Sequence, residues 1–355
     1  MHTTKRTILA AAVSILITGY IHADEHSAAI SQEGGDNNAT LSQSGIGHFA
    51  SSSQDGFLLT STIEQFGNYN RAVTDQGGAE SYIQINQDGE LNQADVVQIA
   101  EVTGHRALIQ QTGEVNQVSV EQLDGTGNSA SITQNGNANV SDLQQEGFGN
   151  SYIGVQTGDG NAVYLEQLRA ASARTDQIGS DNVITLSQDG FPYGARASIS
   201  QDGTGNEATV EQIAAGRYAS GDVDLTQLGA DNVADVFADI GFGNFAFTQD
   251  GTGNELTATL IGLDVFFEGS SVGDYNRVNV DQDGRDISLV INQYGDNNEI
   301  DIEQSGLSGR ATFEHTGNEN YAAVLQAGGY EGLGGDSAAI MQNGVRNSAI
   351  ITQEQ

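Results

Sequence analysis

Glutamine recurs every 11 residues along this chain, and this spacing limits the possible folds more than any other feature. Six consecutive intervals of 11 join the members Gln32, Gln43, Gln54, Gln65, Gln76, Gln87 and Gln98. The series continues, with shifts of a few residues, through Gln201, Gln212, Gln293, Gln304, Gln342 and Gln353. Where a glutamine is due, His315, Leu260 and Ser271 stand instead. A fixed short period of this kind is typical of solenoids and repeat arrays.

Asparagine adds a second period of twice that length. An asparagine stands six residues before every second ladder position, as at Asn232, Asn254, Asn276, Asn298 and Asn320, which are each two glutamine intervals apart. Asn92, Asn206 and Asn347 hold the same place before Gln98, Gln212 and Gln353. The repeating unit is therefore two glutamine intervals long and consists of two similar halves.

Apolar and polar residues alternate between the asparagine and the glutamine, as in Asn-Glu-Ile-Asp-Ile-Glu-Gln over 298–304. A period of two indicates a strand with one face inward, and glycine-containing segments such as Asp-Gly-Thr-Gly over 202–205 indicate turns. The sequence thus predicts an all-β fold, a β-solenoid of stacked strand-turn-strand rungs that is competent to form amyloid. Stacking would place Gln on Gln and Asn on Asn, so that side-chain amides bond along the axis.

The expected organisation has three parts. Residues 1–23 are typical of a secretory signal peptide, with Lys5 and Arg6 before the apolar run from Ile8 to Ile17 and cleavage expected after Ala23. Residues 24–29 form a short N-terminal leader, and residues 30–355 form the repeat array of about 15 rungs, degenerate at 236–275. At about 4.8 Å per rung the rod would be roughly 70 Å long. The repeats continue to the end of the sequence, so we expect strand edges that can pair with another copy.

Charge limits the partners of this chain. The full sequence has a formal net charge of −35, which becomes −37 without Lys5 and Arg6, and no lysine then remains. Nucleic acids and anionic lipids are bound through Lys and Arg, so neither is expected as a partner, and no membrane insertion is expected. The chain has no Cys, so no disulfide stabilises it.

The repeats resemble those of the curlin family, whose pattern is Ser, five residues, Gln-x-Gly-x-x-Asn-x-Ala, three residues, Gln. Residues 81–98 match every fixed position, with Ser81, Gln87, Gly89, Asn92, Ala94 and Gln98. Residues 65–76, 201–212 and 342–353 match it without the leading Ser. The resemblance covers nearly the whole chain after the signal segment.

This resemblance implies a structural subunit of curli-like extracellular amyloid fibres that mediate cell adhesion and form biofilm matrix. It implies export through the periplasm to the cell surface, where the chain joins a homopolymeric fibre. The implied partners are other copies of the chain, a nucleator subunit and an outer-membrane secretion channel. The alternative is a monomeric secreted β-solenoid that binds a surface, a polysaccharide or ice.

Three motifs resemble functional sites, and none predicts catalysis or a cofactor. Gly269 to Gly273 matches the Gly-x-Ser-x-Gly pattern of a hydrolase elbow, but Ser271 occupies a ladder position instead of a strand-to-helix turn. His48, His105 and His315 share no common place in the repeat, so no metal site is predicted. Asp-rich turns permit adventitious calcium, although the 11-residue period differs from the nine-residue unit of calcium-binding β-rolls.

Two further expectations concern the surface and the irregular stretches. Acids that alternate with apolar residues, such as Asp301 and Glu303 beside Ile300 and Ile302, are interpreted as outward gatekeepers that slow premature assembly. The register weakens at 99–106, 213–221, 236–275 and 327–336. Enlarged turns are predicted at the first, second and last of these, and another at 191–194, which contains the single Pro. Degenerate rungs with an aromatic filling are predicted at 236–275, which is rich in Phe.

Overall fold

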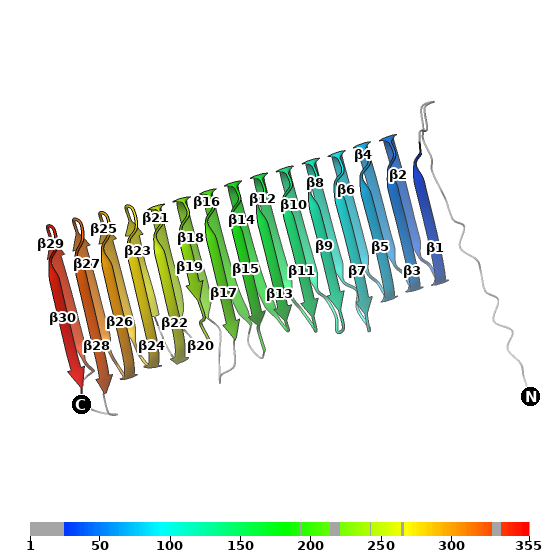
Figure 1. Ribbon diagram of the computed structural model, residues 1–355. Helices are drawn as coiled ribbons and strands as arrows, with labels where there is room; N and C mark the ends of the chain where they lie inside the picture. The colour runs from blue at the N-terminus through cyan, green and yellow to red at the C-terminus, as the bar shows by residue number, and fades with distance from the viewer. Residues whose placement is uncertain are drawn as a thin grey trace, which may run out of the picture.

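The protein is a long two-layered stack of β-strands (Figure 1). The computed structural model describes residues 25–191, 194–213, 221–241, 243–263, 266–328 and 335–354. These ranges contain strands, turns and irregular segments but no helix, so no helix in them could cross a membrane. The predicted signal peptide, Pro192 and most of the turns predicted at 213–221 and 327–336 lie outside the described residues.

Two parallel sheets make up the stack. The first, here sheet A, has 16 strands and the second, sheet B, has 14. Sheet A contains β1 (Ser27–Gly35), β3 (Phe49–Phe57), β5 (Arg71–Ala79), β7 (Gln93–Ala100), β9 (Gln117–Leu123), β11 (Val140–Glu146), β13 (Ala162–Leu168), β15 (Val183–Asp189), β17 (Glu207–Ile213), β19 (Val233–Val236), β20 (Ile240–Gly241), β22 (Glu255–Leu263), β24 (Arg277–Arg285), β26 (Glu299–Leu307), β28 (Tyr321–Gly328) and β30 (Ser348–Glu354).

Sheet B contains β2 (Asn38–Ile46), β4 (Thr60–Asn68), β6 (Tyr82–Glu90), β8 (Arg106–Glu114), β10 (Ser129–Asn137), β12 (Ser151–Asp159), β14 (Ala171–Ser180), β16 (Ala195–Thr204), β18 (Asp222–Ala230), β21 (Asn244–Thr252), β23 (Phe266–Val272), β25 (Ser288–Tyr294), β27 (Arg310–Thr316) and β29 (Ser337–Asn343).

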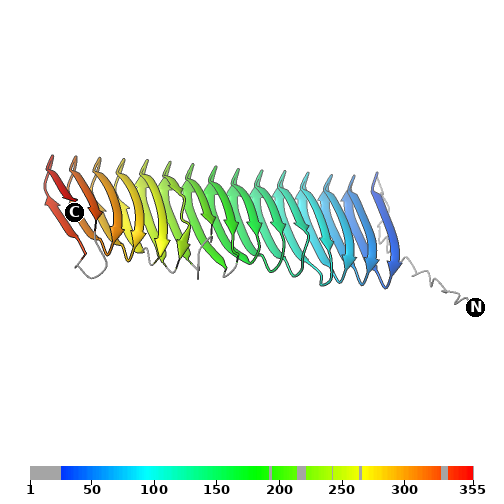
Figure 2. The ribbon, with the colours of Figure 1, turned by 90° about the horizontal axis from the view of Figure 1, so that it is seen from below.

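The chain winds as a solenoid because consecutive strands alternate between the two sheets. Up to β19, each strand pairs in parallel with the second strand along the chain, as β5 does with β3 and β7. The regular offset equals one full repeat, so Gln76 lies between Gln54 and Gln98. The colours of Figures 1 and 2 accordingly follow one another along the stack without crossing. The predicted all-β solenoid of strand-turn-strand rungs is confirmed. Its first strand begins at Ser27, three residues before the predicted start of the array.

The hydrophobic core lies between the sheets and runs along the axis. Two apolar side chains of a typical strand point inward, such as Ile83 and Ile85 on β6 or Ala94 and Val96 on β7, and all four are at most 1% exposed. Burial of an Ile or Val side chain contributes roughly 1.5–3 kcal/mol. The alternation read from the sequence therefore places a largely apolar core between the sheets, flanked by buried amides and interrupted by a few buried hydroxyl residues such as Ser52, Ser61 and Thr74.

Glycine lies inside the strands, and the corner follows it. The sequence suggests that a glycine turn ends each strand, but β6 continues through Gly89 to Glu90, and the chain turns at Leu91 with φ of 57°. A Cβ atom on Gly89 would stand 2.0 Å from the carbonyl oxygen of Gly113 on the next rung. Glycine is needed there because neighbouring backbones approach too closely for any side chain.

The rungs continue through the Phe-rich stretch at 236–275. Phe245, Phe247 and Phe267 are buried in the core, with ring centroids 5.2 Å apart for Phe245 and Phe267 and 5.5 Å apart for Phe247 and Phe267. Bulky aromatic side chains there replace the smaller aliphatic residues of other rungs. The aromatic filling predicted for this stretch is present.

Candidate functional site

Two columns of buried glutamines run the length of the stack, one in each sheet. Where Gln follows Gln in a column, each donates its Nε2 to the Oε1 of the Gln on the next rung, as Gln54 does to Gln76 at 2.9 Å and Gln65 to Gln87 at 2.8 Å. Most of these amides also donate to a backbone carbonyl of the opposite strand, as Gln87 does to Arg71 O at 3.0 Å. The amide of such a glutamine is thus bonded both to the neighbouring rung and to the opposite strand of the stack.

Every predicted ladder residue lies in one of these columns or in the asparagine column beside them. The sheet A column contains Gln32, Gln54, Gln76, Gln98, Gln212, Gln304 and Gln353. The sheet B column contains Gln43, Gln65, Gln87, Gln201, Gln293 and Gln342. Asn92, Asn206, Asn298 and Asn347 stand at the corner that precedes sheet A, each just before a strand.

The asparagine column ties each corner to the next one. Asn92 Oδ1 accepts the backbone N–H and the Nδ2 of Asn116, both at 3.0 Å, while Asn92 Nδ2 donates to Gly113 O at 2.8 Å. The same bonds recur up to Asn347, whose N–H and Nδ2 both donate to Asn320 Oδ1 at 3.0 Å. Each buried asparagine of this kind thus bonds both to the asparagine of the neighbouring rung and to a glycine carbonyl, and these bonds hold the corner in place.

The two kinds of ladder give the stack a direction. In the bonds between like side chains, glutamine donates to the glutamine of the next C-terminal rung, whereas asparagine donates to the asparagine of the preceding, N-terminal rung. Parallel pairing of all strands imposes the same direction on the backbone. Further rungs can continue all three bonding systems only if they are added head to tail.

The glutamine columns are interrupted at four positions, of which the sequence pattern predicted three. Leu260 pairs in register with Gln282, Ser271 lies between Gln249 and Gln293, and His315 lies between Gln293 and Gln342. Sequence reasoning missed the fourth position, Ala238, which continues the register of Val210 on Val236 and is fully buried. Its spacing of 11 residues from Gln227 was the available signal.

The asparagine column also begins in an unpredicted way, with two histidines. His48 N–H lies 3.2 Å from His26 Nδ1, and Asn70 N–H lies 3.1 Å from His48 Nδ1. The two rings stack with centroids 5.1 Å apart. Imidazole nitrogen therefore takes the role that the asparagine carbonyl oxygen has in later rungs.

His315 is the buried position with the poorest hydrogen bonding. Neither Nδ1 nor Nε2 has a partner, and the neighbouring Gln293 Nε2 and Gln342 Oε1 are also buried without one. Burial lowers the pKa of His315 to about 4, because a charged imidazolium would lose its hydration there. Burial also lowers the pKa of His48 and of His105.

The residues weighed for catalysis or metal binding have structural contacts. Ser271 lies on β23 and donates its hydroxyl to Gln293 Oε1 at 3.0 Å. His105 Nε2 contacts Ile99 O at 3.2 Å, and its Nδ1 lies 3.2 Å from Asn128 N–H. In the parts of the chain that the structure describes, no group of three or more His, Cys, Asp or Glu side chains could hold a metal ion. The arrangement is one of repeated self-complementary bonding.

No protein-family model and no curated protein matches this chain.

Proposed function

We propose that this chain is a structural subunit of curli-like extracellular amyloid fibres, which mediate cell adhesion and form biofilm matrix. The observation that carries the proposal is the pair of buried glutamine columns with rung-to-rung bonds of 2.6–3.1 Å. In a stack of this kind each rung is both the product of the last addition and the template for the next. The interface between two copies would then be the interface that already joins successive rungs.

The bonding direction supports head-to-tail growth. A second copy placed head to tail continues the backbone ladder, the glutamine columns and the asparagine column together, whereas a reversed copy opposes donors to donors. Each amide bond contributes only about 0.5–1.5 kcal/mol, so the stability of the joint is collective. Addition of a copy would therefore require that whole rungs dock in register.

Outward carboxylates support controlled assembly. Asp301 and Glu303 lie on the outer face of β26 and alternate with the buried Ile300 and Ile302. Fibres that approach through this face would bring like charges together. We expect replacement of several such acids by Asn or Gln to shorten the lag time of fibre formation. An unchanged lag time would contradict the gatekeeper role.

The decisive experiment is to incubate the purified chain without residues 1–23 and to follow thioflavin fluorescence, sedimentation and fibre diffraction. We expect sedimenting fibres with a reflection at about 4.7 Å along the axis and another at about 10 Å across it, as a cross-β spacing requires. Chains that remain monomeric would contradict the proposal and favour a monomeric solenoid that binds a surface or a polysaccharide. Secretion and adhesion are tested separately, by immunolabelling of fibres on cells that export the chain.

A further inference from the structure

The two sheets of the described stack contain unequal numbers of strands. Sheet A has 16 strands, of which the short β20 lies beside the main path, so 15 remain there against the 14 of sheet B. The first described strand, β1, and the last, β30, accordingly both lie in sheet A. Because the solenoid alternates between its sheets at every strand, the strand that continues the winding after β30 belongs in sheet B.

A second copy can be placed head to tail in two ways. If it is only shifted along the axis, its β1 pairs with β30 in sheet A, and one strand is then missing from sheet B between β29 and the β2 of the second copy. If it is also rotated by half a turn about the axis, its β1 pairs with β29 and its β2 pairs with β30. The rotated copy continues both sheets without a gap, whereas the shifted copy leaves one.

We propose that successive copies of this chain in the fibre are related by a half-turn about the stack axis, with β1 of one copy paired to β29 of the copy before it. This joint is the one through which the proposed fibre grows, so the arrangement rests on the proposed function. It goes further because it fixes the register of the joint and the residues that meet there.

The two strands that meet in the rotated joint have nearly the same sequence. β1 begins Ser-Ala-Ala-Ile-Ser-Gln, and β29 begins Ser-Ala-Ala-Ile-Met-Gln. Pairing of Gln32 with Gln342 therefore places identical residues on each other at every one of these positions except Ser31, which meets Met341. The inward Ala, Ile and Gln side chains then stack like on like, as in a cross-β assembly. The joint thus reproduces the contacts that join rungs within one chain.

The rotated joint also continues the asparagine column with an asparagine. Asn37, just before β2, already has the bonds of a column asparagine: its Nδ2 donates to Gly56 O at 3.0 Å, and its Oδ1 accepts Leu59 N–H at 3.1 Å. In the rotated joint, Asn37 of the second copy follows Asn347 in the column. In the shifted joint, His26 of the second copy would stand there instead. Rotation therefore places an amide where the amide ladder requires one.

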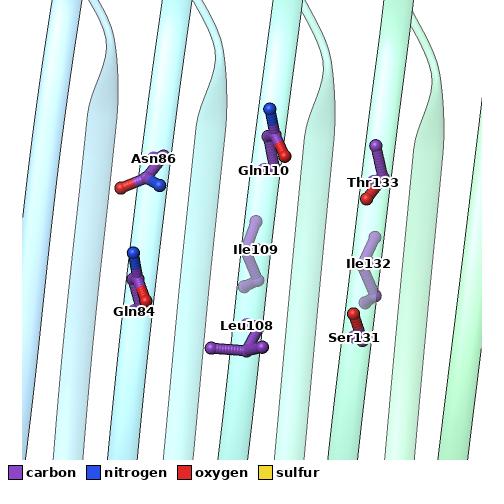
Figure 3. A pocket seen from close by; sticks show the side chains of 8 residues that line it. All are labelled: Gln84, Asn86, Leu108, Ile109, Gln110, Ser131, Ile132 and Thr133. Atoms are coloured by element: carbon purple, nitrogen blue, oxygen red, sulfur yellow. The ribbon is translucent and has the colours of Figure 1, made fainter.

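The half-turn exchanges the two outer faces from one copy to the next. Part of the sheet B face is a shallow hollow of about 170 Å³ over β6, β8 and β10, lined by side chains that include Gln84, Gln110 and Ser131 (Figure 3). Sheet A is the more acidic face. In the row directly before the ladder residue it holds Asp75, Glu121, Glu166, Glu211, Asp281 and Glu303, whereas sheet B holds Glu64, Asp176 and Glu314. Each side of the fibre would therefore show the two faces in alternation.

A charge variant tests the register through the rate of growth. In the rotated joint the corner residue Arg346 lies beside Asp36 of the second copy, and both have a left-handed backbone, with φ of 59° and 56°. In the shifted joint Arg346 lies beside Glu25 instead. We expect Asp36→Arg to slow elongation of the variant from its own seeds by roughly fivefold, because like charges then meet at the joint. Glu25→Arg changes the net charge equally and should slow elongation by less than about twofold. An equal or larger slowing by Glu25→Arg would overturn the half-turn.

Cysteine pairs distinguish the two joints directly, because the chain has no Cys of its own. Ser31→Cys with Met341→Cys places thiols on neighbouring strands of the rotated joint, with Cα atoms about 4.8 Å apart, which a disulfide can span. Ser31→Cys with Thr352→Cys does the same for the shifted joint. The three positions are exposed, so the substitutions leave the core intact.

We expect mild oxidation of the fibres to link the first variant into covalent oligomers on non-reducing gels and to leave the second variant monomeric. The opposite result, or fibres in which neither variant is linked, would overturn the half-turn and leave the proposed function standing. Helical reconstruction of wild-type fibres by electron cryo-microscopy is the second measurement, and copies related by a shift alone would overturn the half-turn. If the wild-type chain forms no fibres, the proposed function itself fails, and the joint fails with it.

Discussion

The stack from β3 to β17 and the stack from β19 to β29 share one fold but differ in their glutamine columns. In the first region every ladder position holds Gln, and bonds run from rung to rung without a break, as from Gln145 to Gln167 at 2.7 Å. In the second region Ala238, Leu260, Ser271 and His315 replace Gln. The asparagine column is continuous through both, from Asn70 to Asn347. The rungs therefore keep their register even where the glutamine bonds stop.

The two types of interruption differ in what they leave unsatisfied. The apolar pair Ala238 and Leu260 removes two amides together and leaves one neighbouring atom, Gln282 Oε1, without a partner. The polar replacement His315 leaves four such atoms, its own two nitrogens with Gln293 Nε2 and Gln342 Oε1. A buried polar atom without a partner costs about 1–3 kcal/mol. An apolar break thus disturbs the ladder less than one polar residue of the wrong shape.

The largest effect is expected when the intact region is broken on purpose. Gln145→Leu removes the bonds from Gln122 and to Gln167 and leaves a buried donor and a buried acceptor, so we expect a loss of about 3 kcal/mol in unfolding free energy. Gln144→Leu, at an exposed position of the same strand, should change the unfolding free energy by less than about 0.5 kcal/mol. Guanidinium unfolding of the soluble chain measures both. Equal midpoints would contradict the importance of the ladder.

Acid should weaken the interrupted region through His315. The pKa of this side chain is about 4 in the folded state and 6.5 when it is free. Between these pH values His315 is therefore protonated in the unfolded chain and neutral in the folded chain. Above pH 6.5 His315 does not change the unfolding free energy with pH. Between pH 6.5 and pH 4 the unfolding free energy falls by about 1.4 kcal/mol per pH unit, a total loss of about 3 kcal/mol. Hydrogen exchange of the β27 amides across this window measures the loss. An unchanged opening free energy of β27 would refute it.

Repair of the ladder at the same position should stabilise the second region at neutral pH. His315→Gln supplies an acceptor for Gln293 Nε2 and a donor for Gln342 Oε1, so we expect a gain of about 1–2 kcal/mol. The variant should also lose the pH dependence that His315 causes between pH 6.5 and pH 4. His315→Leu is the control, because it removes the imidazole but restores no bond. If both variants stabilise β27 equally, the missing hydrogen bonds are not the cause of its weakness.

The smallest effect is expected at Ser271, where the interruption is already partly bridged. Ser271 donates to Gln293 Oε1, so Ser271→Gln adds only the link to Gln249 and should stabilise the chain by about 0.5–1 kcal/mol. Thermal unfolding of the soluble chain, compared with that of Ser270→Gln at the adjacent outward position, measures this gain. A larger gain than that of His315→Gln would show that the interruption at Ser271 costs more stability than the one at His315, contrary to this prediction.

Most of the repeat could be predicted because the same residue types, Gln and Asn, recur at fixed spacings. The glutamine spacing and the doubled asparagine spacing indicated the two-strand rung, and the ladder roles of Leu260, Ser271 and His315 followed from the same spacing. Ala238 was missed because alanine is common at inward positions and carries no signal of its own. The strand that continues through Gly89 was missed because glycine in a sequence does not tell a turn from a close backbone approach.

By itself the sequence determined the rung, because alternation and spacing are local properties that each strand satisfies without reference to the others. Only the tertiary structure decided that strands continue through their glycines and that outward residues of alternate halves gather on opposite faces. Asp301 and Ser131 occupy equivalent outward places in the repeat but lie on different sheets. The contrast between a strongly acidic face and a less acidic one exists only when the chain winds, because winding sorts consecutive strands into two layers.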